Sequence, residues 1–279
     1  MRCFANGLEH HVIEWGAGSP TALILHGFQD AAATWDDVAV SLARSEMRVL
    51  APDMRGFGDG PWVPKGAYYH FPDYVADVAG LVTRLAGDGP LFLVGHSMGA
   101  SIATYFTGAF PERVAKLVLV DGVGPPESRP DVAPARMRAW IATMEAVGDG
   151  LDNDPFDSMG EVEARLARYH PGLDRETLAR HARQLVRAVD GGFAWKRDPL
   201  HATTSPALFF ARSFEAFLRR VTCPVLHVSG GERGLHVPDE EQRLACVANL
   251  TRITIEGGHG LHWSKPRELA EALVAFWRS

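Results

Sequence analysis

The chain has few cysteines and no long apolar run. Cys3, Cys223 and Cys246 are the only cysteines in 279 residues, and they form neither a CxxC pair nor the even set that a disulfide framework needs. No apolar run approaches the roughly 20 residues that span a bilayer, and the first residues, MRCFANGLEHHVIEW, lack the apolar segment of a secretory signal. We therefore expect a soluble, cytoplasmic protein that does not enter a membrane.

The sequence also lacks a basic patch. Lys and Arg number 28 against 34 Asp and Glu, which gives a formal net charge of -6, and the positive charges are scattered along the chain. A nucleic-acid-binding protein normally gathers its positive charge on one face. The sequence therefore predicts no nucleic-acid partner, and it predicts no basic cluster near a binding crevice that would recognise phosphate.

Apolar residues make up 46% of the chain and occur in short runs that alternate with longer helical patterns. Buried strands are predicted at 21–25, 48–51, 91–94, 116–120 and 224–229, weaker strands at 9–15 and 251–256, and helices at 31–45, 71–86 and 267–278. This alternation is typical of an α/β fold with a mostly parallel twisted sheet flanked by helices.

One segment interrupts the alternation. Residues 122–221 open with a Pro-rich stretch and continue through Arg-rich helical patterns with no convincing strand. Ligands of open α/β sheets bind outside the carboxyl ends of the strands, so an insertion between two strands would cover that crevice. We therefore expect residues 1–121 and 222–279 to form the core and residues 122–221 to form a helical cap.

The sharpest motif is Gly95-His96-Ser97-Met98-Gly99, which follows a predicted strand and precedes a helical run. In this context G-x-S-x-G forms a tight turn that lifts the Ser hydroxyl into the crevice, so Ser97 is the predicted nucleophile. A Ser hydroxyl needs an imidazole to take its proton. His259 follows a Gly pair after the last predicted strand and is the predicted base, with His262 as the competing candidate.

An acyl-transfer site also needs two backbone N–H groups that stabilise the oxyanion. Met98 follows the nucleophile and supplies the first, whereas Phe28, in the turn His26-Gly27-Phe28 after the strand 21–25, is the candidate for the second. Without the other motifs, a plain turn would be the preferred interpretation of these three residues.

Four ordered motifs carry a family resemblance: HGF at 26–28, PDMRGFGDG at 52–60, GHSMG at 95–99 and EGGHGLHWSKP at 256–266. Together they resemble the α/β-hydrolase superfamily. The segment WKRDPLH at 195–201 is similar to the cap end of its serine-hydrolase-like members. The resemblance implies an α/β-hydrolase fold, a Ser–His–acid triad, no metal and no organic cofactor.

The triad acid departs from the superfamily pattern. The superfamily usually places an Asp in the turn after the strand that residues 224–229 resemble, but here that turn reads GGERGLHVP. Asp121, which ends the strand 116–120, and Glu232, which lies in the turn, are the two candidates. We predict Asp121, because a strand end is held more rigidly than a Gly-rich turn, and Glu232 remains the alternative acid.

These features predict a serine hydrolase that cleaves a small, neutral, moderately apolar carboxylic ester or lactone through an acyl-enzyme, as a monomer or small homo-oligomer. The same residues could act on a carbon–carbon bond or transfer an acyl group. The absence of the usual acid leaves open a catalytically weak ligand-binding protein on a hydrolase scaffold. A serine at position 97 argues against epoxide hydrolases and haloalkane dehalogenases, which require a carboxylate nucleophile there.

Overall fold

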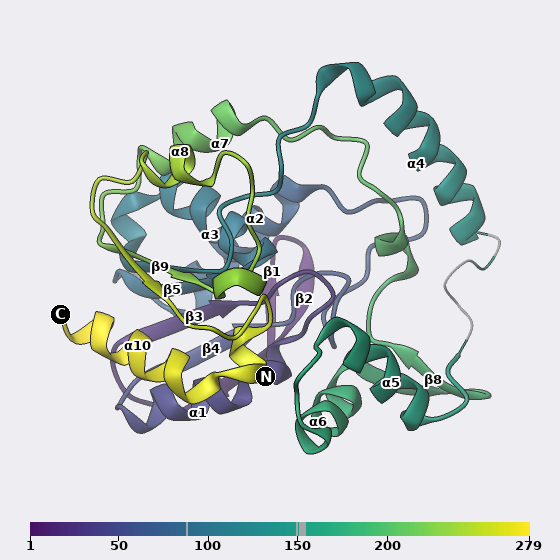
Figure 1. The fold of residues 1–279 in the computed structure, drawn as a ribbon, viewed down its shortest axis with the longest axis horizontal. Coiled ribbons are helices and arrows are strands. Elements are labelled where there is room, and N and C mark those ends of the chain that lie inside the picture. Colours follow the sequence, from purple (N-terminus) through teal and green to yellow (C-terminus); the bar gives the residue numbers. More distant parts are fainter. Residues whose placement is uncertain (88, 149, 151–154) are drawn as a thin grey trace.

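A sheet of eight strands lies at the centre of the computed structural model, which describes residues 1–87, 89–148, 150 and 155–279 (Figure 1). The strands are β1 (Arg2–Ala5), β2 (Leu8–Trp15), β3 (Thr21–Leu25), β4 (Arg48–Pro52), β5 (Leu91–His96), β6 (Val114–Val120), β9 (Val225–Ser229) and β10 (Leu250–Thr254). Their order across the sheet is β1-β2-β4-β3-β5-β6-β9-β10. All pairs from β4 to β10 are parallel, whereas β1 and β2 pair antiparallel with their neighbours.

The α/β fold with a mostly parallel sheet is therefore confirmed. Each predicted strand is present within a few residues of its expected bounds. The short strand β1 was not predicted, because four residues with two buried side chains give too little periodicity to identify a strand.

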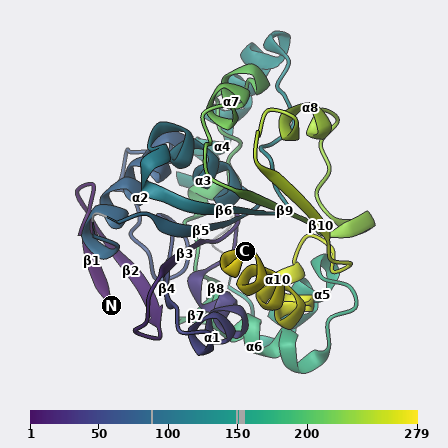
Figure 2. The same ribbon diagram turned by 90° about the vertical axis from the view of Figure 1, so that its left-hand side faces the viewer.

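Helices cover both faces of the sheet. The α-helices are α1 (Asp36–Arg44), α2 (Phe71–Leu85), α3 (Met98–Ala109), α4 (Ala133–Gly148), α5 (Met159–Tyr169), α6 (Arg175–Leu185), α7 (Ala211–Leu218), α8 (Glu240–Leu244), α9 (Leu261–Ser264) and α10 (Pro266–Arg278). The 3-10 helices are η1 (Ala32–Trp35), η2 (Pro111–Arg113), η3 (Pro130–Val132), η4 (Pro199–Ala202) and η5 (Gly231–Arg233). Figure 2 shows α1 and α10 below the sheet and α2, α3 and α7 above it. No helix in the described residues is long and apolar enough to cross a membrane.

Two apolar cores result, one on each face. Helices α2, α3 and α7 contribute to the first core, together with inward-facing strand residues. Helices α1 and α10 bury their apolar sides in the second. Helices thus cover both faces of the sheet. The edge formed by the carboxyl ends of the parallel strands remains as the place where a site can form.

The segment 122–221 has more structure than predicted. The hairpin of β7 (Val186–Val189) and β8 (Gly192–Trp195) contradicts the expectation that this segment holds no strand. Helices α5 and α6 lie beside this hairpin (Figure 1). Together they form a small core that also includes Trp263. Helix α7 instead buries Phe214 and Leu218 in the main core. In α4, by contrast, no side chain is buried.

Candidate active site

Ser97 lies in the sharp turn between β5 and α3, with a φ of 53° that non-glycine residues rarely adopt. Two glycines make this turn possible. A Cβ on Gly99 would lie 2.1 Å from the Leu25 carbonyl oxygen, and one on Gly95 would lie 2.4 Å from the Gly99 oxygen. The backbone N–H of Ser97 donates to the Val120 carbonyl at 3.1 Å. The G-x-S-x-G pattern is therefore required by close backbone packing around the serine.

His259 lies between the Ser97 hydroxyl and a carboxylate. Its Nε2 is 3.0 Å from Ser97 Oγ, and its Nδ1 is 2.6 Å from Asp121 Oδ2. Because an ionised carboxylate only accepts hydrogen bonds, Nδ1 carries the proton and Nε2 can accept one from the serine. The His259 side chain is 43% exposed whereas that of Asp121 is 1% exposed. The imidazole is thus held from its buried side and open to a ligand on the other.

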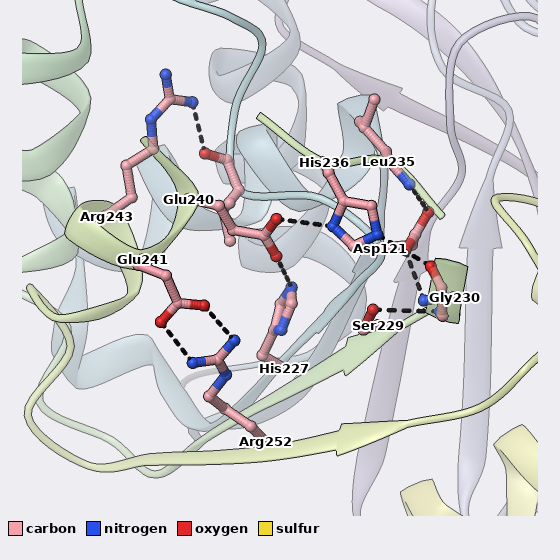
Figure 3. A network of polar contacts seen from close by, with 12 residues as sticks. Asp121, His227, Ser229, Gly230, Leu235, His236, Glu240, Glu241, Arg243 and Arg252 are labelled. Atoms are coloured by element: carbon pink, nitrogen blue, oxygen red, sulfur yellow. Dashed lines mark hydrogen bonds and ion pairs between the residues drawn. The ribbon is translucent and has the colours of Figure 1, made fainter. Parts of the chain in front are cut away.

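Asp121 directly follows β6 and is oriented by the turn after β9. The backbone N–H of Gly230 donates to Asp121 Oδ1 at 2.6 Å, and the N–H of Leu235 donates to Oδ2 at 2.7 Å (Figure 3). This is the turn in which the superfamily usually places its acid and in which this chain has no Asp. Its backbone donates hydrogen bonds to a carboxylate that comes from the neighbouring strand, and these bonds point that carboxylate at His259.

Glu232 has a different environment. It lies in η5 with an exposed side chain, and it forms no hydrogen bond with His259 in the described part of the chain. Of the two acids that the sequence offered, the structure brings Asp121, not Glu232, to the imidazole.

A second polar network braces the same turn. His236 Nδ1 lies 3.0 Å from Glu240 Oε2 (Figure 3), and its Nε2 lies 2.9 Å from the Gly231 carbonyl oxygen. The Gly231 carbonyl and then the Glu240 carboxylate raise the pKa of His236, since both acceptors favour the protonated ring. His227 Nε2 lies 3.9 Å from Glu240 on the other side. The turn that holds Asp121 is thus tied to α8.

The two predicted oxyanion donors lie beside the elbow. Met98 is the first residue of α3, and Phe28 follows Gly27 after β3. A Cβ on Gly27 would lie 2.8 Å from His96 Nδ1 and 3.2 Å from Ser97 Cβ, so this turn packs directly on the elbow. In the described chain, neither the Phe28 nor the Met98 amide donates a hydrogen bond to another residue. Both N–H groups are therefore available to a ligand atom.

His262 and His96 have supporting positions beside the site. His262, the competing base, donates from Nε2 to Asp30 Oδ2 at 3.0 Å and stacks on Trp35 with ring centroids 4.4 Å apart. His96 donates from Nε2 to the His259 carbonyl at 2.8 Å. Burial lowers the pKa of His96 well below its usual value, so its ring is neutral at neutral pH. His96 thus holds the His259 backbone, a contact that no sequence signal identifies.

Within the described residues, two groups of side chains come close enough to hold a metal ion. They are Asp30 with His96 and His262, and His11 with Asp53 and Asp59. Each group already bonds internally, because His262 donates to Asp30 and His11 Nδ1 lies 2.6 Å from Asp53 Oδ2. In the first group, the Nδ1 atoms of His96 and His262 are buried without a hydrogen-bond partner among the described residues.

A cavity of about 700 Å³ lies beside the site. Phe28, His96 and His259 line it from the core, and α5, the loop after α5 and residues 195–197 line it from the inserted segment. Five basic side chains also line it: Arg165, Lys196, Arg197, Arg233 and Lys265. The prediction that no basic cluster lies near the crevice is therefore wrong. Apart from the adjacent Lys196 and Arg197, these residues are far apart in the sequence and come together only in the folded chain.

Residues 20–266 match the family model of the α/β-hydrolase fold. The chain belongs to this family, and it is a hydrolase by class. The motif resemblance drawn from the sequence is thus confirmed.

Individual relatives cover almost the whole chain. A serine hydrolase-like protein of Danio rerio is 28% identical over 274 residues, which are 94% of this chain and 83% of the relative. An esterase of Mycobacterium tuberculosis is 28% identical over 264 residues, which are 93% and 83% of the two chains. The solved thioesterase domain from the curacin biosynthetic pathway is similar with a TM-score of 0.85 and 25% identity, covering 98% of both chains.

Proposed function

We propose that the protein hydrolyses a small carboxylic ester or lactone with Ser97 as its nucleophile. One observation carries the proposal: continuous hydrogen bonds run from Asp121 through His259 to Ser97, at 2.6 and 3.0 Å. A nucleophile, a base and a group that orients the base are the parts that covalent acyl transfer needs. The similarity to an esterase and to a thioesterase domain supports an ester-type bond.

In the first half of the reaction, Ser97 Oγ attacks the carbonyl carbon while His259 Nε2 takes the hydroxyl proton. The Asp121 carboxylate stabilises the imidazolium through Nδ1–H. The N–H groups of Phe28 and Met98 donate to the oxyanion, and one such donor is worth about 10²- to 10³-fold in turnover. The alcohol leaves with the proton from His259, and the acyl group stays on Ser97.

In the second half, water replaces the alcohol. His259 takes a proton from the water molecule, whose oxygen attacks the acyl carbon, and returns that proton to Ser97 Oγ when the acid is released. One ester and one water give one acid and one alcohol, and the protein is regenerated.

The alternatives have less support. The ligand-binding alternative depended on the absence of a triad acid, and the contact between Asp121 and His259 favours catalysis instead. A neutral substrate was expected because no basic cluster was predicted near the crevice, and that reason no longer holds.

The test is the initial rate on nitrophenyl esters of increasing acyl length, with Ser97→Ala as the control. We expect turnover that disappears in the variant, with an optimum acyl length set by the size of the cavity. Equal rates for both proteins at every length would reject the proposal, provided that circular dichroism shows both to be folded.

A further inference from the structure

The cavity beside His259 has more positive than negative side chains in its wall. Among the described residues, the five basic ones face only two acidic ones, Asp30 and Glu256. The oxygens of Asp30 accept hydrogen bonds from His262 and Thr34. Only Glu256 therefore offers a negative charge that is not already bonded within the core, although its own side chain is exposed.

Two histidines of the wall, His96 and His170, add no charge at neutral pH. Burial lowers the pKa of His170 to about 4 and that of His96 well below its usual value, so both rings are neutral. The charges of the arginines and lysines in the wall do not depend on pH between about 6 and 8.

Three of the five basic side chains have partners within the protein. Lys196 pairs with Asp59 at 2.9 Å and Lys265 pairs with Glu268 at 3.0 Å. Arg197 also has an interaction partner. Carboxylates therefore compensate the charges of Lys196 and Lys265.

Arg165 and Arg233 differ from these three. Neither forms an ion pair with any described residue, and Arg233 makes one long hydrogen bond, 3.5 Å from Nη1 to the Pro171 carbonyl. Arg165 comes from α5 and Arg233 ends η5, the 3-10 helix within the turn that holds Asp121. Two guanidinium groups without carboxylate partners among the described residues thus line one cavity. Arg165 reaches it from α5, and Arg233 reaches it from the turn after β9.

We propose that Arg165 and Arg233 bind an oxyanion group, a carboxylate or a phosphate, that forms part of the substrate. A guanidinium presents paired N–H donors that match both groups. His259 and Phe28 line the same cavity, so a substrate anchored there by its anion reaches the Ser97–His259 site with its ester bond. This inference deepens the proposed function and rests on it. It replaces the uncharged ester expected from the sequence with an anionic one.

The anion can belong to the acyl part or to the leaving group, and two matched pairs of esters separate these sources. Mono-4-nitrophenyl glutarate and 4-nitrophenyl valerate have the same chain length and differ by a terminal carboxylate on the acyl part. Butyryl-coenzyme A and S-butyryl-N-acetylcysteamine share the thioester and differ by the phosphates of the leaving group. In at least one pair, we expect kcat/KM of the wild type to be about tenfold higher for the charged member.

The variant Arg165→Gln/Arg233→Gln should lose that preference, and added salt should weaken it in the wild type because both side chains are exposed. Arg168→Gln is the matched control, since Arg168 lies on the same helix but does not line the cavity. Arg165→Lys/Arg233→Lys should restore part of the preference. An equal or higher rate on the uncharged member in both pairs would overturn the inference, as would a preference that survives the double Gln variant.

A binding measurement separates failure of this inference from failure of the proposed function. Calorimetry with Ser97→Ala measures the affinity for the same intact esters without turnover. A charged-ester preference in binding, without any turnover by the wild type, would reject the proposed function and keep the anion site. Turnover by the wild type with no charge preference in rate or affinity would keep the proposed function and reject the anion site.

Discussion

Asp121 Oδ2 lies 2.6 Å from His259 Nδ1, although 138 residues separate the two in the chain. The sheet explains how they meet. Strands β6 and β9 are parallel neighbours, so the end of β6 and the turn after β9 lie at the same edge. An acid at either place can reach the same imidazole, and in this chain the turn after β9 donates two backbone hydrogen bonds to the acid instead of carrying it.

Asp121→Asn tests this relationship. An asparagine cannot stabilise the imidazolium and favours the wrong tautomer of His259, so we expect kcat on the best ester to fall roughly 10⁴-fold. Thermal unfolding of the variant checks that the Gly230 and Leu235 contacts still hold the turn. Glu232→Gln is the control and should keep kcat within a few-fold of the wild type. A large loss in the control together with a nearly normal Asp121→Asn would move the acid to Glu232.

A fluorophosphonate probe, which reacts with an activated serine, distinguishes the roles of His259 and His262. His259→Gln should abolish rapid labelling of Ser97, because among the described residues no other imidazole forms a hydrogen bond with Ser97 Oγ. His262→Gln should still be labelled, and its main effect should be a lower unfolding temperature, since His262 packs on Trp35 and bonds Asp30 in the core. Normal labelling of His259→Gln, with loss in His262→Gln, would reverse the two assignments.

Local patterns in the sequence predicted the parts of the fold and site that depend on local geometry. The turn around Ser97 needs glycine on both sides, and that need is visible in five adjacent residues. The choice between Asp121 and Glu232 is not local, because it depends on which strand ends face His259. No local sequence pattern indicates that Arg165 and Arg233 line the same cavity. One lies in the insertion and the other in the turn after β9, so only the folded chain places them in one cavity.

Gly99→Ala should destabilise the protein strongly. The new methyl group would lie 2.1 Å from the Leu25 carbonyl oxygen, and both partners are backbone that cannot move independently. Overpacking of this kind costs about 2 kcal/mol or more. Gly148→Ala is the matched control, because a Cβ there meets nothing within 4 Å and should change stability by less than about 0.5 kcal/mol. Urea denaturation measures both, and equal midpoints for the two variants would contradict the close packing at the elbow.

Three neutral histidines predict loss of stability in acid. Burial lowers the pKa of His170 and His181 to about 4 and that of His201 to about 3, whereas the ordinary value is 6.5. Below pH 6.5 the unfolded chain binds protons at these positions and the folded chain does not. The free energy of unfolding is therefore unaffected above pH 6.5 and falls as the pH drops toward 4.

Urea midpoints across this range measure the effect, and His201→Phe tests its origin. The His201 ring stacks on Phe57 with centroids 4.0 Å apart, and its Nε2 has no hydrogen-bond partner in the described structure. A phenyl ring keeps the stacking and removes the proton site, so the variant should lose stability less steeply below pH 6.5 than the wild type. The same slope in both proteins would show that His201 does not contribute, and a steeper slope in the variant would contradict the sign of the argument.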